Sequence, residues 1–283
     1  MKLLVGKTAL VTGASRGIGL AIARRFAAEG ASVVLCASRL GTHGKLQGTL
    51  EEAVALIKAQ QGQAAAVACD LSDADARADL LARANQYFGP IDILVNNAAA
   101  ADMILPSAVT TAQRNFMYDL NVNVPIELAQ QAMPSMRERG AGWILNISSR
   151  SCEQPIVPYR DSAIAAHVIS AYGATKAALN RYSSGLAHEV AEHGIYVNTL
   201  APENIVLTSA AEYVRDIARR NPDMAEPVEM MAEAALALCH GSTVGQVCYS
   251  RRLVHSMGLS VKSLDGKTLL GNALLPADLD ASA

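Results

Sequence analysis

Residues 12–19 read Thr12-Gly13-Ala14-Ser15-Arg16-Gly17-Ile18-Gly19, and this stretch decides the fold. It follows a short β-rich run at 8–11 and opens an Ala-rich segment of helical spacing at 17–29. Three nearby glycines are a weak signal in a chain that holds 20, and a plain glycine turn is the alternative. Placement between a first strand and a first helix strengthens the signal, because glycines there let a pyrophosphate reach the backbone N–H groups of the helix N-terminus. We therefore predict a dinucleotide site.

Outward from this turn, short β-rich runs alternate with longer helical segments through the first 250 residues. The β-rich runs are continuously apolar, which is typical of strands buried on both faces of a parallel sheet. They lie at 8–11, 32–35, 91–95, 143–147 and 195–198. The helical segments lie at 17–29, 49–60, 73–87, 113–138, 171–193 and 227–239. This alternation predicts the α/β class, with a Rossmann-like, doubly wound parallel sheet.

The chain shows no internal repeat, low-complexity tract or Gly/Ser linker, so we expect a single domain over residues 1–250. Residues 251–283 carry no strong periodicity and are expected to form a C-terminal tail. Whether this tail covers the substrate site, closes over a neighbouring subunit or frays stays open.

Composition excludes several classes of partner. The net charge is −2 and both signs are mixed along the chain, so neither nucleic acid nor a membrane surface is expected as a partner. No stretch approaches the roughly 18 unbroken apolar residues that a spanning helix needs. Five cysteines without C-x-x-C spacing indicate reduced thiols and a cytoplasmic protein. The six histidines lack metal-ligand spacing, so we expect no metal site.

The end of the second strand indicates which dinucleotide binds. A carboxylate there would accept hydrogen bonds from the adenosine ribose and repel a 2′-phosphate. The sequence instead has Cys36-Ala37-Ser38-Arg39, with no acidic residue until Glu51. Ser38 offers a hydroxyl, Arg39 offers a multi-donor cation suited to phosphate, and Arg16 is expected near the same ribose. We predict NADP(H), the alternative being that Arg39 is a solvated loop cation.

Two further segments are expected in the same pocket. Asp70 follows the third strand and could accept a hydrogen bond from the adenine amine. It could equally cap the helix at 73–87, although Ser72 fits that role better. After the fourth strand comes Asn96-Asn97-Ala98-Ala99. Small residues there let the backbone approach a cofactor, and an Asn side chain can brace neighbouring strands.

A tyrosine and a lysine four residues apart are the candidate catalytic pair. Tyr172 and Lys176 lie at the start of the helical segment 171–193 and share one helix face. A neighbouring cation stabilises a phenolate, so we expect Lys176 to lower the pKa of Tyr172. Such a tyrosine can exchange a proton with an alcohol oxygen. The spacing arises by chance too often to stand alone, and it gains weight from the glycine turn upstream.

With these motifs in order, the sequence resembles the short-chain dehydrogenase/reductase family over about residues 5–250. Thr12–Gly19 resembles the family's cofactor turn, Asn96–Ala99 its Asn-Asn-Ala-Gly element, and Tyr172 with Lys176 its catalytic pair. The resemblance assigns the family's serine to Ser149 and its active-site asparagine to Asn121. It implies that Ser149 holds the substrate oxygen and that Tyr172 is the acid/base. Lys176 would bind the nicotinamide ribose and tune Tyr172, and Asn121 would anchor a proton-relay water.

The resemblance also implies a cofactor site and an oligomer. The chain would form a homodimer or homotetramer through 113–138 and 171–193. The residues expected to bind the cofactor are Gly13, Ser15, Arg16, Gly17, Ile18, Gly19, Ser38, Arg39, Asp70, Leu71, Asn97, Ala98, Tyr172, Lys176, Pro202 and Ile205.

Three departures from the family pattern stand out. Ala99 replaces a glycine, a change we expect to be tolerated, and Pro202-Glu203 replaces Pro-Gly, with no role evident for the added charge. Ser149 and Tyr172 are 23 residues apart, which is long for the family. The extra residues, 150–170, are expected to form a lid over the substrate. Asn123 competes with Asn121 for the relay role.

The leading hypothesis is an oxidoreductase that transfers hydride between NADP(H) and a secondary alcohol or ketone. Low polarity around the presumed site favours an apolar small-molecule substrate whose identity the sequence does not show; the residues are Ile104, Leu105, Ile156, Val157, Ile205, Val206 and Leu207. One alternative is an NADP(H)-binding regulatory or scaffold protein without turnover. Another is a dehydratase or epimerase of the same family.

Overall fold

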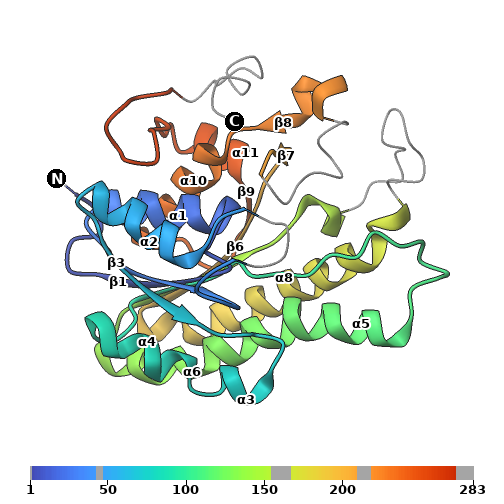
Figure 1. Cartoon of the computed structure of the whole chain (residues 1–283), viewed down its shortest axis with the longest axis horizontal. Helices are drawn as coiled ribbons and strands as arrows, with labels where there is room; N and C mark the ends of the chain where they lie inside the picture. The colour runs from blue at the N-terminus through green and yellow to red at the C-terminus, as the bar shows by residue number, and fades with distance from the viewer. Residues whose placement is uncertain (1, 43–46, 154–166, 209–217, 272–283) are drawn as a thin grey trace.

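A computed structural model of the chain describes residues 2–42, 47–153, 167–208 and 218–271. Within these residues, parallel strands form a seven-stranded sheet of order β3-β2-β1-β4-β5-β6-β9 (Figure 1). Strand order reverses between β1 and β4, which places the topological switch point where the glycine turn begins. The strands are β1 (Thr8–Thr12), β2 (Ser32–Ala37), β3 (Gln63–Ala68), β4 (Ile93–Asn96), β5 (Gly142–Ile147), β6 (Ile195–Ala201) and β9 (Val247–Tyr249).

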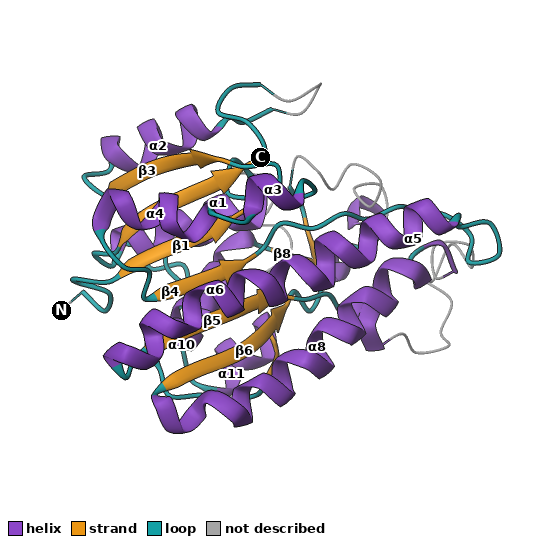
Figure 2. Ribbon diagram, turned by 90° about the horizontal axis from the view of Figure 1, so that it is seen from below, coloured by secondary structure: helices purple, strands orange, loops and turns teal. Residues whose placement is uncertain are grey.

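Helices cover both faces of this sheet, as the continuously apolar strands predict. One face packs against α1 (Gly17–Ala28), α2 (Leu50–Ala59), α10 (Val228–His240) and α11 (Ser250–Ser256). The other packs against α4 (Leu80–Phe88), α6 (Val124–Arg139) and α8 (Ser170–Val190). Figure 2 shows α5 (Thr111–Tyr118) and the start of α8 extending beyond the carboxyl edge of the sheet. The predicted Rossmann-like α/β fold is therefore confirmed.

Several predicted elements need correction. The segment 113–138 is one continuous rod, but a π-helical turn, Asp119–Asn123, joins α5 to α6. The segment 73–87 is two helices, α3 (Ala74–Arg77) and α4. Asp73, not Ser72, caps the first of them, because its Oδ1 accepts from the Asp75 N–H at 3.0 Å.

Two strands of the main sheet carry little sequence signal. β3 reads Gln-Ala-Ala-Ala-Val-Ala, and alanine favours helices more than strands. β9 has three residues. A separate pair, β7 (Ile205–Val206) and β8 (Ala225–Glu226), lies after β6. β3 forms by pairing with β2, and β9 forms by pairing with β6. Local composition does not reveal these pairings.

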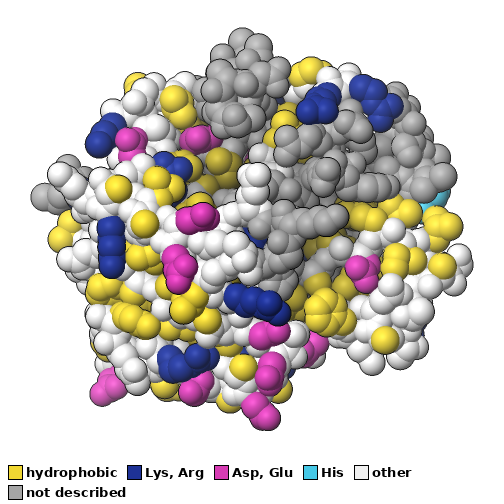
Figure 3. Space-filling view, in the orientation of Figure 1, with side chains coloured by type: hydrophobic (Ala, Val, Ile, Leu, Met, Phe, Trp, Pro, Cys, Tyr) yellow, Lys and Arg dark blue, Asp and Glu magenta, His cyan; other side chains and the backbone are white. Residues whose placement is uncertain are grey.

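The start of the predicted tail is ordered. It forms α11, and both Val254 and Val261 are fully buried in the core cluster that contains α10. Residues 154–166 of the predicted lid lie outside the described residues. On the face shown in Figure 3, positive and negative side chains are interspersed among hydrophobic ones over the described residues, as the mixed sequence predicts.

Two buried arginines join elements far apart in the chain. Arg25 on α1 bonds Glu29 at 2.7 Å and Glu233 on α10 at 2.9 Å. Arg77 bonds Asp119, at the start of the π-helical turn, at 2.9 Å and Glu127 on α6 at 2.7 Å. The Arg77 ion pairs hold the π-helical turn that carries Asn121 in place, because a buried guanidinium requires charged partners.

Candidate active site

The glycine turn excludes side chains where it meets the segment that follows β4. Gly13 and Gly17 adopt left-handed φ values of +62° and +58°. A Cβ on Gly19 would lie 2.5 Å from both the Gly13 carbonyl oxygen and the Asn97 Nδ2. Glycine is thus required at position 19 by close approach and favoured at the other two by backbone conformation.

Asn97 and Thr12 hold this turn against β4. The Asn97 Nδ2 donates to the carbonyls of Thr12 at 2.9 Å and Gly13 at 3.1 Å. The Thr12 hydroxyl oxygen accepts from the N–H groups of Asn97 and Ala98. Asn96 bonds Asn146 on β5 at 2.8 Å. The predicted bracing of neighbouring strands by asparagine is confirmed, and both asparagines take part.

The start of α1 fits a dinucleotide pyrophosphate. The first N–H groups of a helix lack intrahelical partners, and the cap residue Arg16 supplies no side-chain bond to them. These groups are therefore free to bind oxygen atoms of a pyrophosphate, with the helix dipole favouring negative charge. Ser15 and Ile18 flank the same turn, and the Ser15 hydroxyl accepts from the Arg16 Nε at 3.4 Å.

The structure brings together two of the residues predicted to contact the adenosine, Ser38 and Asp70, but not Arg39. Ser38 and Asp70 line one pocket of about 420 Å³ at the ends of β2 and β3. Asp70 also accepts from the Ser72 hydroxyl at 2.7 Å. Leu71 is buried, and its carbonyl accepts from Arg77. Arg39 is exposed and does not line this pocket, whose remaining charged residues are Asp73, Asp75, Asp79 and Arg83.

Tyr172, Ser149 and Lys176 meet at the carboxyl end of β5. Tyr172 lies close enough to Ser149 for the serine hydroxyl to favour the tyrosine phenolate, and the Ser149 Oγ accepts from the Ser151 hydroxyl at 2.9 Å. Lys176, 2% exposed, donates from Nζ to the Ile147 carbonyl at 2.8 Å and lies 5.7 Å from the centroid of the Tyr172 ring. Gly173 permits this packing, because a Cβ there would lie 2.5 Å from the Ser151 carbonyl oxygen.

The electrostatics of the pair differ from expectation. Burial raises the pKa of Tyr172 to about 12, and the hydrogen bond from Ser149 only partly opposes it. Burial also lowers the pKa of Lys176 to about 8. The expected lowering of the Tyr172 pKa by Lys176 is therefore wrong in this structure. Loss of water destabilises both charged forms, and the Lys176 Nζ is bonded to a backbone carbonyl.

Asn121, rather than Asn123, lies against the catalytic helix. It is fully buried, and its Nδ2 donates to the Thr175 hydroxyl at 2.9 Å and to the Ala100 carbonyl at 2.8 Å. Asn123 is exposed and bonds Asp119 at 3.2 Å. Both amide hydrogens of Asn121 are thus used to join the π-helical turn to α8 and to the segment after β4.

A buried carboxylate that the sequence did not single out holds the segment after β6. Glu226 is 1% exposed, accepts from the Asn204 N–H at 3.1 Å and hydrogen-bonds to the Ser250 hydroxyl. Ser250 in turn accepts from the Glu203 N–H at 3.2 Å. Pro202 and Ile205 flank this segment. Burial raises the pKa of Glu226 to about 7.

Glu203, whose role was not evident from the sequence, contacts two arginines. Its Oε1 accepts from the Arg252 Nε at 2.7 Å, and its carbonyl accepts from Arg150 at 3.0 Å. Among the described residues, no group of three or more His, Cys, Asp or Glu side chains is placed to hold a metal ion. In the same part of the chain, none of the helices has the length and apolar character needed to cross a membrane.

Several known proteins are similar to this chain in sequence. A family profile described as short chain dehydrogenase matches residues 7–218. The ketoacyl reductase HetN of Nostoc sp. is 33% identical over 202 residues, which cover 71% of this chain and 64% of that protein. The chain likewise spans 60% and 63% of two further curated relatives. It therefore spans less than two thirds of the length of these relatives.

Solved structures share the fold. A 3-oxoacyl (acyl-carrier-protein) reductase from Agrobacterium tumefaciens with NADP bound is 32% identical, with a TM-score of 0.73 over 87% of this chain and 93% of that one. A 7α-hydroxysteroid dehydrogenase complexed with NADH and 7-oxo glycochenodeoxycholic acid is 31% identical, with a TM-score of 0.75 over the same shares of the two chains. The profile match covers most of the chain, and the chain belongs to the short-chain dehydrogenase/reductase family.

Proposed function

We propose that this chain is an NADP(H)-dependent oxidoreductase that interconverts a secondary alcohol and a ketone. The observation that carries the proposal is the position of Tyr172 next to Ser149 and beside the buried Lys176. These groups lie at the carboxyl edge of the sheet, where ligands of doubly wound folds bind. A sensor without turnover has no need of a tyrosine and a serine placed together beside a buried lysine.

Each residue has a role in this proposal. Ser149 holds the substrate oxygen, and Tyr172 exchanges a proton with it. A Tyr172 pKa of about 12 keeps the phenol protonated at neutral pH, so it is ready to donate to a carbonyl oxygen. The nicotinamide supplies or accepts the hydride when bound. Lys176 binds the nicotinamide ribose beside Tyr172.

Asn121 positions rather than reacts. Because both of its amide hydrogens join neighbouring segments, we assign the anchoring of a relay water to the backbone of the π-helical turn. Such turns are frequent at functional sites.

The NADP(H) preference rests on the end of β2. Ser38 and Arg39 stand where an NAD-specific carboxylate would be, and the Agrobacterium relative has NADP bound. The carboxylates of Asp73, Asp75 and Asp79 line the neighbouring pocket and disfavour a phosphate there. A 2′-phosphate would therefore bind on the Arg39 and Arg16 side of the ribose.

Substrate class and assembly extend the proposal. A ketone substrate fits both structural relatives. One is named as a 3-oxoacyl reductase, and the other is complexed with a 7-oxo compound. Phe116 and Tyr118 on α5 are 48% and 42% exposed, which supports a homodimer or homotetramer through 113–138 and 171–193. The five cysteines are free, which favours a reducing compartment such as the cytoplasm.

Tyr172→Phe tests the acid/base assignment. We expect turnover of NADPH with an active ketone to fall about 10²–10⁴-fold, the usual contribution of a positioned acid. Tyr182→Phe, on the same helix, is the matched control and should keep its activity. Near wild-type turnover in Tyr172→Phe would remove the mechanism. Cofactor binding with no turnover of any alcohol or ketone in a broad panel would favour a sensor.

Arg39→Ala tests the cofactor preference. Loss of a guanidinium–phosphate contact should weaken NADPH binding about tenfold or more while leaving NADH binding nearly unchanged. The dissociation constants of both cofactors are measured by fluorescence titration of the same variant. Equal losses for the two cofactors would contradict the assignment.

A further inference from the structure

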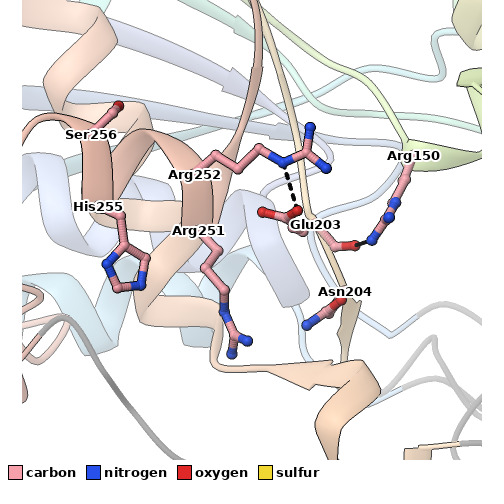
Figure 4. A pocket seen from close by; sticks show the side chains of 7 residues that line it. All are labelled: Arg150, Glu203, Asn204, Arg251, Arg252, His255 and Ser256. Carbon is pink, nitrogen blue, oxygen red and sulfur yellow. Dashed lines mark hydrogen bonds and ion pairs between the residues drawn. The ribbon is translucent and has the colours of Figure 1, made fainter.

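A pocket of about 660 Å³ lies beside the candidate active site and carries a surplus of positive charge. Its walls come from three places in the chain: the turn after β5, the segment after β6, and α11. Figure 4 shows the side chains that line it: Arg150, Glu203, Asn204, Arg251, Arg252, His255 and Ser256.

The pocket shares its backbone with the proposed site. Arg150 directly follows Ser149, and Glu203 directly follows Pro202. The pocket therefore begins at residues that are adjacent in the chain to those of the proposed site.

The positive charge is only partly neutralised. The Glu203 carboxylate pairs with Arg252, whose guanidinium also stacks over the Tyr249 ring at 5.0 Å. Arg150 donates to the Glu203 carbonyl, a neutral acceptor. Arg251 is near the buried carboxyl of Glu226 but forms no ion pair within 4.0 Å among the described residues. Two guanidinium groups thus remain available on either side of the Glu203–Asn204 segment, as Figure 4 shows.

Buried hydrogen bonds hold two of the segments that line the pocket. Ser250, which precedes Arg251, is fully buried and joins Glu226 to the Glu203 N–H. On the other side, Cys152 accepts from Asn180 on α8 at 3.1 Å, which holds the turn after β5. Positions 251 and 255 lie on one face of α11 because they are four residues apart. The backbone segments that carry the arginines are therefore held in place, which lowers the cost of ordering the pocket around an anion.

We propose that this pocket binds an oxyanion, a carboxylate or phosphate carried by the substrate at a distance from its ketone. Arg150 and Arg251 are the two binding residues. Glu203 orients the pocket, which explains why a carboxylate replaces the glycine usual in the family at this position. The inference rests on the proposed function and specifies its substrate as an apolar ketone with an anionic end.

Matched substrates test the pocket. We expect oxo acids of increasing chain length to be reduced with a kcat/KM at least tenfold above that of their neutral methyl esters, with an optimum length. The preference should decrease as ionic strength rises. A ketone carrying a phosphate ester distinguishes a phosphate-selective pocket from a carboxylate-selective one. Equal kcat/KM for acid and ester at every length would overturn the proposal.

Two variants test whether Arg150 and Arg251 bind the anionic end of the substrate. Arg251→Gln and Arg150→Gln should each raise KM for the acids about tenfold, with little change in kcat and little change for the esters. Arg251→Lys should restore part of the loss. Arg137→Gln, an exposed arginine paired with Glu189 on the opposite side of the sheet, is the control. Variants that lose acids and esters equally would show a structural role only.

A binding measurement separates this inference from the proposed function. The NADPH-loaded Tyr172→Phe protein is titrated calorimetrically with the oxo acids and with their esters. Tighter binding of the acids, lost in Arg251→Gln, supports the pocket even where turnover is absent. Equal binding of acids and esters rejects the pocket, whatever Tyr172 does in catalysis.

Discussion

At the carboxyl end of β1, the candidate site is shaped by the absence of side chains, whereas at the carboxyl end of β6 it is shaped by buried and paired charges. Gly13 and Gly19 make room for Asn97 and for a cofactor backbone contact. On the other side, Glu226 holds the Glu203–Asn204 segment. We propose that the first half binds the nicotinamide cofactor and that the second half contacts the substrate.

The two halves approach each other between Gly17 and Thr208. A Cβ on Gly17 would lie 3.5 Å from Thr208, which follows β7. The crowded glycine turn and the charged segment after β6 therefore lie next to each other in one site. Substitutions in each half should fail for different reasons, and the size and pH dependence of the effects separate those reasons.

The largest effect is expected from Gly19→Ala. The new Cβ would meet a backbone carbonyl at 2.5 Å, and a backbone oxygen cannot turn aside as a side chain can. We expect the dissociation constant for NADPH to rise roughly tenfold or more and the free energy of unfolding to fall by about 2–3 kcal/mol. Gly41→Ala, where a Cβ meets no atom within 4 Å, is the matched control. Unchanged NADPH binding would show that the turn tolerates side chains.

Glu226→Gln tests the charged half through pH. Because burial raises the folded-state pKa from 4.5 to about 7, the folded chain keeps a proton that the unfolded chain releases. The free energy of unfolding should therefore fall as pH rises from about 4.5 to 7, by about 3 kcal/mol in total. Glutamine keeps an acceptor for the Asn204 N–H but does not titrate, so this decline should be absent.

The measurement is urea unfolding of wild type and variant at a series of pH values. The stability of Glu226→Gln relative to wild type should increase up to pH 7 and then stay level. Lys176 does not interfere, because its pKa of about 8 affects stability above that value. Glu51→Gln, an exposed position on α2, is the control. Parallel curves for wild type and Glu226→Gln would mean that hydrogen bonds to the carboxylate offset its burial in the folded chain.

The same contrast explains what the sequence could predict. Glycines at a first strand–helix turn, and a tyrosine four residues before a lysine, carry their meaning in residue type and spacing. The dinucleotide turn and the pairing of Tyr172 with Lys176 follow from them, whereas Ser149 was assigned by the resemblance to the family. Asn121 was identified as well, although its bonds to Thr175 and Ala100 were not.

The other half depends on contacts that spacing does not encode. Glu226 is one of many acidic residues, and only its burial beneath residues 203–204 distinguishes it. The pKa of Tyr172 was expected to fall because the sequence shows a nearby cation, whereas the degree of burial is a property of the packed structure. The strand β3 and the helix α11 form for the same reason, since tertiary packing stabilises segments of weak local preference.

The smallest effect is expected where the halves meet. Gly17→Ala brings a Cβ to ordinary contact distance from Thr208, so its cost should come from the left-handed φ of +58° alone, about 1–2 kcal/mol. Gly17→Asn adds more atoms but tolerates that backbone conformation better. If the backbone decides, urea unfolding will show asparagine to be less destabilising than alanine. If contact with Thr208 decides, the order reverses, and the crowding seen at Gly19 extends across the whole turn.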